Sequence, residues 1–210
     1  MRRFEVNELT RVASPEPFPQ GVAFHGGALW VSSCKTFGLA EIDLPSWNVG
    51  ARATAPGEPF GIAATEEGMR VVVGFGEDAD DRFIYRFRAN EGFSDPIPCP
   101  DLSGAYLAYH DGTLFLSQAH NKRILALAGR TVTKEISLAR RPVGITAVSG
   151  ALFVLSTDDD FQDMEFGRLD LSTGELTGRA LVPFGARGLA FDGSRFWTAD
   201  RKNSELVAWS

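Results

Sequence analysis

Hydrophobic and polar residues alternate along most of the chain in short runs, and one combination of runs recurs five times. In residues 21–32 a short apolar run, a glycine-containing turn and a second apolar run ending in small polar residues predict a β-hairpin. Equivalent hairpins begin near residues 21, 61, 106, 144 and 188, and Tyr106 stands where the other copies have glycine. These steps of about 40 residues are typical of the four-stranded blades of a β-propeller.

Each interval also has room for two further strands. Third strands are predicted at 39–44, 83–87, 123–127 and 166–171, with outer strands such as 50–54 and 131–136. The fifth repeat stops after its third strand, 204–209, whereas residues 9–13 form a strand without a blade of its own. We therefore predict an all-β, five-bladed propeller of four-stranded antiparallel blades, a single domain over residues 1–210, whose last blade is closed by the N-terminal strand.

Composition narrows the possible partners. The chain has 210 residues with Lys+Arg 21 and Asp+Glu 27, a net charge of −6, and no basic run, so nucleic acid is not expected to bind. No secretory signal and no run of about 18 apolar residues is found, so we expect a cytoplasmic monomer without a membrane partner. Cys34 and Cys99 lack CxxC spacing, which favours free thiols over a single bridge. Glycine fingerprints for phosphates or dinucleotides are absent too, so no cofactor is expected.

The predicted fold places candidate ligand-binding residues on one face. In a propeller, the loops that lead into the inner strands and the loops between second and third strands meet around the mouth of the central channel. The residues expected to bind a ligand there are Gln20, Phe60, Tyr106, Arg141 and Arg187. The arginines suit a carboxylate or a phosphate. The alternative is that each arginine pairs with a local aspartate such as Asp200.

Two other kinds of chemistry have weaker candidates. The acidic runs 78–81 and 158–163 could offer Asp78, Asp158 and Asp160 to a calcium ion, but neither run has EF-hand spacing, so solvated loop acids are the favoured interpretation. His120 lies in a mouth loop and could act as a base toward Cys34, although no motif supports this couple. Aromatic residues at one position of the second strands, Trp30, Phe115, Phe153 and Trp197, are expected to pack in the core.

The blade openings carry a resemblance to known propellers. The sequences Pro19-Gln20-Gly21-Val22-Ala23, Pro59-Phe60-Gly61-Ile62-Ala63, Pro142-Val143-Gly144-Ile145-Thr146 and Arg187-Gly188-Leu189-Ala190 resemble the openings of NHL-type blades. With five repeats in a short chain, the sequence is also similar to the five-bladed plant and bacterial type of glutaminyl cyclotransferase. The likeness is spread over the whole chain and is best over residues 18–44.

The resemblance to the cyclotransferases implies a pocket glutamine, which this chain keeps as Gln20. Other positions depart from the family: its catalytic glutamate falls on Phe60, an Asn-Glu pair on Val143-Gly144, an asparagine on Arg187, and a late lysine near Asp200. Without the glutamate the proton-transfer group is missing, so cyclase activity is not expected.

Propellers of the gluconolactonase kind hold a divalent metal with carboxylate and amide groups at the blade openings. Phe60, Ala105 and Val143 cannot coordinate a metal, so this activity is not expected either. We therefore expect a protein that binds a small anionic or amide-containing molecule, or a peptide end, at the mouth. The alternatives are a protein-interaction scaffold and a hydrolase, lyase or cyclase in the same pocket, with a proton carried by Asp200, Glu58 or His120.

Overall fold

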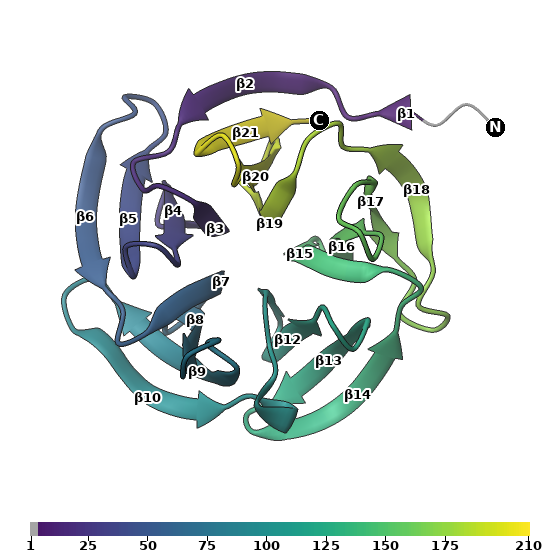
Figure 1. Ribbon diagram of the computed structural model, residues 1–210, viewed down its shortest axis with the longest axis horizontal. Coiled ribbons are helices and arrows are strands. Elements are labelled where there is room, and N and C mark those ends of the chain that lie inside the picture. The colour runs from purple at the N-terminus through teal and green to yellow at the C-terminus, as the bar shows by residue number, and fades with distance from the viewer. Residues whose placement is uncertain (1–3) are drawn as a thin grey trace.

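The computed structural model describes residues 4–210, which form five sheets arranged as blades around a central axis, each built on four antiparallel strands (Figure 1). This confirms the predicted five-bladed propeller. In order from the inner to the outer strand, the blades are β3 (Pro19–His25), β4 (Ala28–Ser33), β5 (Gly38–Asp43) and β6 (Val49–Thr54); β7 (Glu58–Thr65), β8 (Gly68–Phe75), β9 (Asp81–Arg88) and β10 (Gly92–Pro98); β11 (Leu107–His110), β12 (Thr113–Gln118), β13 (Arg123–Ala128) and β14 (Thr131–Ser137); β15 (Arg141–Val148), β16 (Ala151–Thr157), β17 (Met164–Leu169) and β18 (Leu176–Leu181); and β19 (Ala186–Phe191), β20 (Phe196–Asp200), β21 (Glu205–Trp209) and β2 (Glu8–Ala13).

The fifth blade is completed by the N-terminal strand, as predicted. Strand β2 pairs antiparallel with β21, with Val12 opposite Leu206. Beside this pair, Asn7 and Ser210 exchange two backbone hydrogen bonds of 3.0 and 3.1 Å. The closure gives β21 a partner on both sides, so this strand has no unpaired edge.

A short strand that the sequence did not predict precedes this closure. Strand β1 (Phe4–Glu5) lies parallel to β18 and adds a fifth strand to the fourth blade (Figure 1). The backbone N–H of Val6 then donates to the carbonyl of Leu181. The N-terminal segment therefore bridges blades four and five before it enters β2.

The hydrophobic core consists of five clusters, and each fills the space between two neighbouring blades. Trp30 packs between blades one and two and Trp197 between blades five and one, both almost fully buried. Phe115 and Phe153 are partly buried against the clusters on either side of blade four. The expectation that these aromatic residues belong to the core is confirmed, and large apolar side chains stabilise the blade-to-blade contacts.

Other elements are small. Within residues 4–210 the helical structure is one 3-10 turn, η1 (Pro100–Leu102), and no helix there is long and apolar enough to cross a membrane.

Cys34 and Cys99 are both buried and carry free thiols, in agreement with the expectation that no disulfide joins them.

Candidate functional site

The inner strands of four blades are irregular at the residues that open toward the mouth. Pairing of the first and second strands shifts between Pro19 and Val22 in blade one, and the same kind of shift occurs in the other three blades, at 59–62, 142–144 and 187–190. Such bulges turn a side chain out of the regular alternation of a strand. They fall at Gln20, Phe60 and Val143, and directly after Arg187.

Hydroxyl groups on the second strands bond to the backbone at these bulges. Ser32 Oγ accepts a hydrogen bond of 2.8 Å from the Gly21 N–H and donates to the Phe60 carbonyl of the next blade. In blade five, Thr198 Oγ1 lies 2.7 Å from the carbonyl oxygen of Gly188. The small polar residues that end the second strands thus satisfy backbone groups that the bulges leave out of the ladder.

The blade-opening glycines allow neighbouring blades to approach at backbone distance. A Cβ atom on Gly21 would lie 2.1 Å from the Phe60 carbonyl oxygen, and one on Gly61 would lie 2.3 Å from the Cα of Tyr106. Only glycine fits at such contacts. In blade three the equivalent residue is Tyr106, and its phenol extends toward Gln20 of blade one.

The phenol of Tyr106 and the amide of Gln20 meet across the channel. Gln20 Nε2 donates a hydrogen bond of 2.7 Å to the Tyr106 hydroxyl, and both side chains are buried. Gln20 Oε1 is also buried and has no hydrogen-bond partner among the described residues. Burial raises the pKa of Tyr106 to about 12, so the hydroxyl is protonated at neutral pH.

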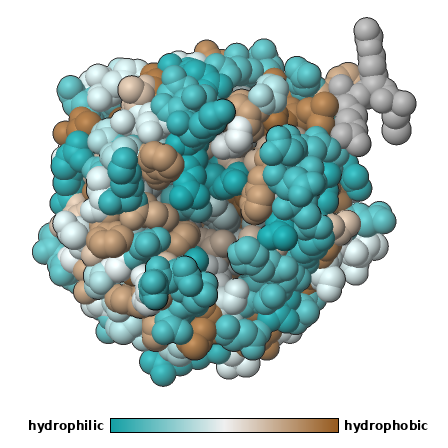
Figure 2. All heavy atoms as spheres, viewed as in Figure 1, coloured by the Kyte–Doolittle hydropathy of each residue, from teal (hydrophilic) through white to brown (hydrophobic). Residues whose placement is uncertain are grey.

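These two side chains belong to the wall of a cavity at the mouth, with a volume of about 370 Å³. Figure 2 shows that the molecule is hollowed near the centre of the ring, where polar and apolar atoms both reach the surface. The lining combines aromatic, apolar, amide and charged groups contributed by all five blades. It consists of Gln20, Phe60, Asp80, Arg82, Ser103, Gly104, Ala105, Tyr106, Ala119, His120, Val143, Phe161, Arg187 and Arg201.

Three arginines line this cavity, and within residues 4–210 no ion pair joins any of them to a carboxylate. Arg187 donates to the carbonyl of Ala186 at 2.8 Å. Arg82 donates to backbone carbonyls and lies over the Phe60 ring, 3.5 Å from its centroid. Desolvation lowers the pKa of Arg82 from its usual value. The cavity therefore presents guanidinium groups to whatever enters it.

Arg141, predicted to bind ligand, is instead occupied at the rim. Its Nε lies 2.9 Å from Asp159 Oδ1, and its Nη1 lies 3.0 Å from His120 Nδ1. Arg141 is not among the residues that line the cavity, whereas Phe161 is. The centre of the Phe161 ring lies 5.4 Å from the guanidinium of Arg141 and 5.0 Å from that of Arg187. Pairing with a local aspartate thus describes Arg141 but not Arg187.

Asp200, offered both as a proton carrier and as a partner for Arg187, has a different role. Its carboxylate is buried and bonds to Arg11 Nη1 at 2.8 Å, and the Asn203 amide donates to it at 2.9 Å. The proposed pairing of Arg187 with Asp200 is therefore wrong, because Arg11 from the closing strand takes that position. Neither Asp200 nor Glu58 lines the cavity, so His120 is the one suggested proton carrier located there.

The acidic loops are organised by their own backbone. Asp158 Oδ1 accepts hydrogen bonds from the N–H groups of Gln162 and Asp163. Desolvation is the largest single influence on the pKa of Asp158 and raises it, but these hydrogen bonds and other interactions together outweigh it, so the pKa is lowered. Asp78 and Asp160 are exposed. No group of three or more His, Cys, Asp or Glu side chains converges as a metal site in the part of the chain from Phe4 to Ser210.

Cys34 is poorly suited to act as a nucleophile. Its Sγ lies 3.2 Å from the Pro59 carbonyl, and burial raises the pKa of the thiol to about 12. A thiol must be ionised to attack a substrate, so at neutral pH Cys34 is inert. It is also absent from the cavity lining.

Arg82, Arg201 and Phe161 line the cavity but were not predicted from the sequence as ligand-binding residues. Arg201 and Phe161 lie in loops between second and third strands, which were expected to face the mouth, and Arg82 is the second residue of β9 at the same end of its blade. Their position along the blade was therefore a usable signal. The sequence did not indicate which loop side chains point into the cavity, because their direction depends on contacts between blades.

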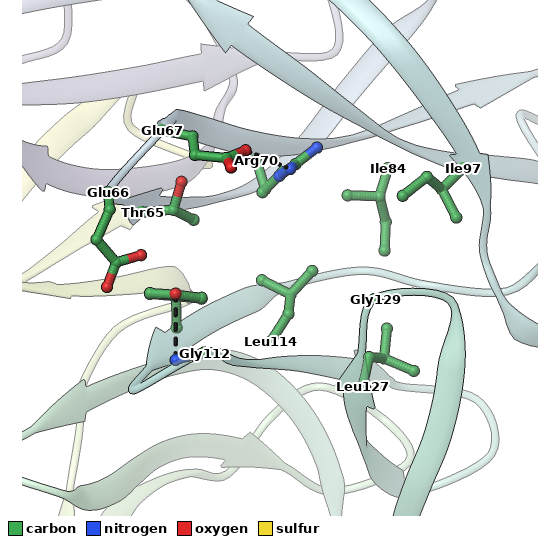
Figure 3. A pocket seen from close by; sticks show the side chains of 11 residues that line it. Thr65, Glu66, Glu67, Arg70, Ile84, Ile97, Gly112, Leu114, Leu127 and Gly129 are labelled. Atoms are coloured by element: carbon green, nitrogen blue, oxygen red, sulfur yellow. Dashed lines mark hydrogen bonds and ion pairs between the residues drawn. The ribbon is translucent and has the colours of Figure 1, made fainter.

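A second hollow lies between blades two and three on the opposite face (Figure 3). It has a volume of about 280 Å³ and an apolar wall that includes Ile84, Leu114 and Leu127. Its one arginine, Arg70, is paired with a carboxylate of the same wall, since Glu67 and Arg70 form an ion pair at 3.3 Å. The mouth cavity, with its unpaired cations, is the stronger candidate site.

Comparisons with known proteins support the fold and leave the activity undetermined. A scan against protein-family models finds no match, and a search of curated proteins finds none. Among solved structures, the chain is similar to Myxococcus xanthus glutaminyl cyclase with a TM-score of 0.77 and 13% identity, over 100% of this chain and 98% of that one. It is also similar to the calcium-binding protein regucalcin from Agrobacterium tumefaciens, with a TM-score of 0.66 and 12% identity over 100% and 96% of the chains. The class that these findings define is a five-bladed propeller.

Proposed function

We propose that this propeller binds a small organic anion in the mouth cavity. The observation that carries the proposal is Arg187, which lines the cavity without a carboxylate partner among the described residues. A guanidinium held in this way offers a forked pair of donors that matches a carboxylate or a phosphate.

The remaining wall supports a ligand with an organic body. Phe60, Val143 and Phe161 supply apolar surface, and the buried Gln20 Oε1 is available to accept a hydrogen bond from the ligand. Ligand cavities in proteins commonly combine a largely apolar wall with a few directed polar groups. A peptide C-terminus carries the same carboxylate and belongs to this ligand class. A cytoplasmic location forms part of the proposal, because two buried free thiols fit a reducing compartment.

Isothermal titration of the purified protein at pH 8 tests the proposal, with benzoate, phenyl phosphate and glutarate as probes and neutral benzamide as the uncharged control. We expect at least one anion to bind and benzamide not to. Arg187→Gln should weaken binding by about 10-fold or more, the loss expected for a hydrogen bond to a charged group. Arg70→Gln is the matched control, because it removes an arginine on the opposite face. Absence of binding by every anion, or equal binding to Arg187→Gln, would overturn the proposal.

A further inference from the structure

The charges of the cavity wall are unbalanced. Arg82, Arg187 and Arg201 contribute three guanidiniums, and Asp80 contributes the one carboxylate among the lining residues. With histidine counted as uncharged, the formal charge of this lining is +2, although the whole chain carries −6. We propose that the cavity selects an organic dianion, a phosphate monoester or a dicarboxylate, over a monoanion of the same size. This inference rests on the proposed function.

The three guanidiniums all affect the same buried group, the hydroxyl of Tyr106. They come from β9, from β19 and from the loop after β20, yet each of them favours ionisation of the buried Tyr106 hydroxyl through its charge. Arg82 and Arg201 also favour ionisation of the Cys34 thiol. The cations therefore lie near the floor of the cavity from two blades, Arg82 from blade two and Arg187 and Arg201 from blade five. Because Coulomb attraction scales with the charge of the ligand, a dianion in this cavity is attracted more strongly by the three cations than a monoanion is.

Arg201 is the cation most available to a second anionic group. Its guanidinium lies 5.8 Å from the centre of the Phe18 ring, and no hydrogen bond or ion pair from its side chain to another group of residues 4–210 is found. Arg82, by contrast, donates to the carbonyls of Ala79 and Gly104 and is stacked on Phe60. Arg82 thus supplies a fixed charge, whereas Arg201 can turn toward the ligand.

The size and lining of the cavity favour an organic dianion over a free inorganic ion. A volume of about 370 Å³ lies at the lower end of the range of small-molecule sites, roughly 300 to 1,000 Å³. The apolar wall formed by Phe60, Ala105, Val143 and Phe161 would be left in contact with water around a bare phosphate. An aromatic or aliphatic body beside the anionic group would cover that surface and contribute the hydrophobic part of the affinity.

Titration calorimetry of the whole chain at pH 8 with matched probes tests this selectivity. Phenyl phosphate carries two charges at this pH because its second pKa is about 6, whereas methyl phenyl phosphate carries one. Phthalate and benzoate form the equivalent carboxylate pair, and inorganic phosphate tests the need for an organic body. We expect the dianion of each pair to bind about 10-fold more tightly, and phenyl phosphate to bind more tightly than inorganic phosphate.

The variant Arg201→Gln locates the effect. It should reduce phenyl phosphate binding by about 10-fold and change methyl phenyl phosphate binding less than 2-fold, since the monoanion is held by Arg187. Lys202→Gln, an exposed neighbour with the same charge change, is the matched control and should bind both probes as the native protein does. Equal affinity for the two members of each pair, or a loss that is the same for Lys202→Gln, would overturn the inference while leaving anion binding intact. Absence of binding by all probes would instead reject the proposed function on which it rests.

Discussion

The side-chain amide of Gln20 in blade one donates a 2.7 Å hydrogen bond to the hydroxyl of Tyr106 in blade three. The two blades are not neighbours in the ring, so this bond crosses the central channel. It forms because Tyr106 occupies the position that glycine takes in the other blades. The bond closes the floor of the mouth cavity and fixes the orientation of a buried amide.

Tyr106→Phe removes the acceptor of this bond and leaves a buried amide N–H without a partner. We expect the free energy of unfolding to fall by about 1–3 kcal/mol, the cost of an unsatisfied buried donor. Urea denaturation followed by tryptophan fluorescence measures this. Tyr109→Phe is the control, because Tyr109 bonds to the backbone of Gly112 at the edge of a turn on the opposite face. An equal loss of unfolding free energy in both variants would show that the hydrogen bond between Gln20 and Tyr106 stabilises the protein no more than the bond of Tyr109 does.

Alkaline pH should destabilise the protein through its two buried thiols. Burial raises the pKa of both Cys34 and Cys99 from 9.0 to about 12. The stabilising effect of these raised pKa values is fully present below pH 9 and is lost as the pH rises from 9 to 12, since the unfolded chain releases the protons first. Each thiol should contribute a slope of about 1.4 kcal/mol per pH unit in this window.

Urea denaturation at a series of pH values measures that slope. The double variant Cys34→Ala, Cys99→Ala lacks both thiols and should lose stability less steeply between pH 9 and 11. Tyr106 contributes in the same direction, because its pKa is raised from 10.0 to about 12, and the Tyr106→Phe variant separates its share. Identical slopes for the native protein and the double variant would contradict the assignment to the thiols.

Deletion of residues 1–14 removes β2 and should lower the melting temperature by more than about 10 °C, given that 1 kcal/mol corresponds to roughly 2–4 °C in a chain of this size. The deletion exposes the edge of β21 and removes Val12 from the cluster between blades one and five. Deletion of residues 1–5 is the control, because β1 comprises two exposed residues and β2 stays in place. Light scattering should also reveal association of the longer truncation through its open edge. Equal melting curves would reject closure by β2.

Arg11→Met leaves the buried carboxylate of Asp200 without its cation. The loss of stability should be about 3 kcal/mol, as for other buried ion pairs from which one partner is removed. Asp200→Asn in the same chain removes the uncompensated charge, so the double variant should be more stable than Arg11→Met alone. A double-mutant cycle in urea measures the coupling, and additive losses would contradict a direct pair.

The fold was predictable because its information is repeated. Five copies of the hairpin set the number of blades, and the unpaired strand at residues 9–13 matched the strand missing from the fifth blade. Strand β1 escaped prediction because two residues, Phe4 and Glu5, carry no periodicity. The bulges at the blade openings also left no pattern of their own, although the glycines and the small polar residues that accompany them did.

The candidate site was predictable to the level of loops. Gln20, Phe60, Tyr106 and Arg187 line one cavity because the topology alone brings blade openings together. The ion pairs could not be predicted from the sequence. Arg11 lies far from Asp200 along the chain and becomes its partner only when β2 pairs with β21. A repeat determines where a residue stands on its blade, whereas the direction of a long side chain depends on the neighbouring blade.

The paired backbone hydrogen bonds between Asn7 and Ser210 bring the residue after β21 beside the residue before β2, within reach of a short peptide linker. A linker there would give the propeller a covalently continuous circumference, and the chain could then be opened at a turn of another blade. Such a circular permutant, joined from Ser210 to Asn7, would lack β1 but keep the pairings of β2 to β21 while moving the closure away from blade five. Its unfolding rate can then be compared with that of the native chain. A different rate would show that the position of the closure affects the lifetime of the folded state, because both proteins have the same five four-stranded blades.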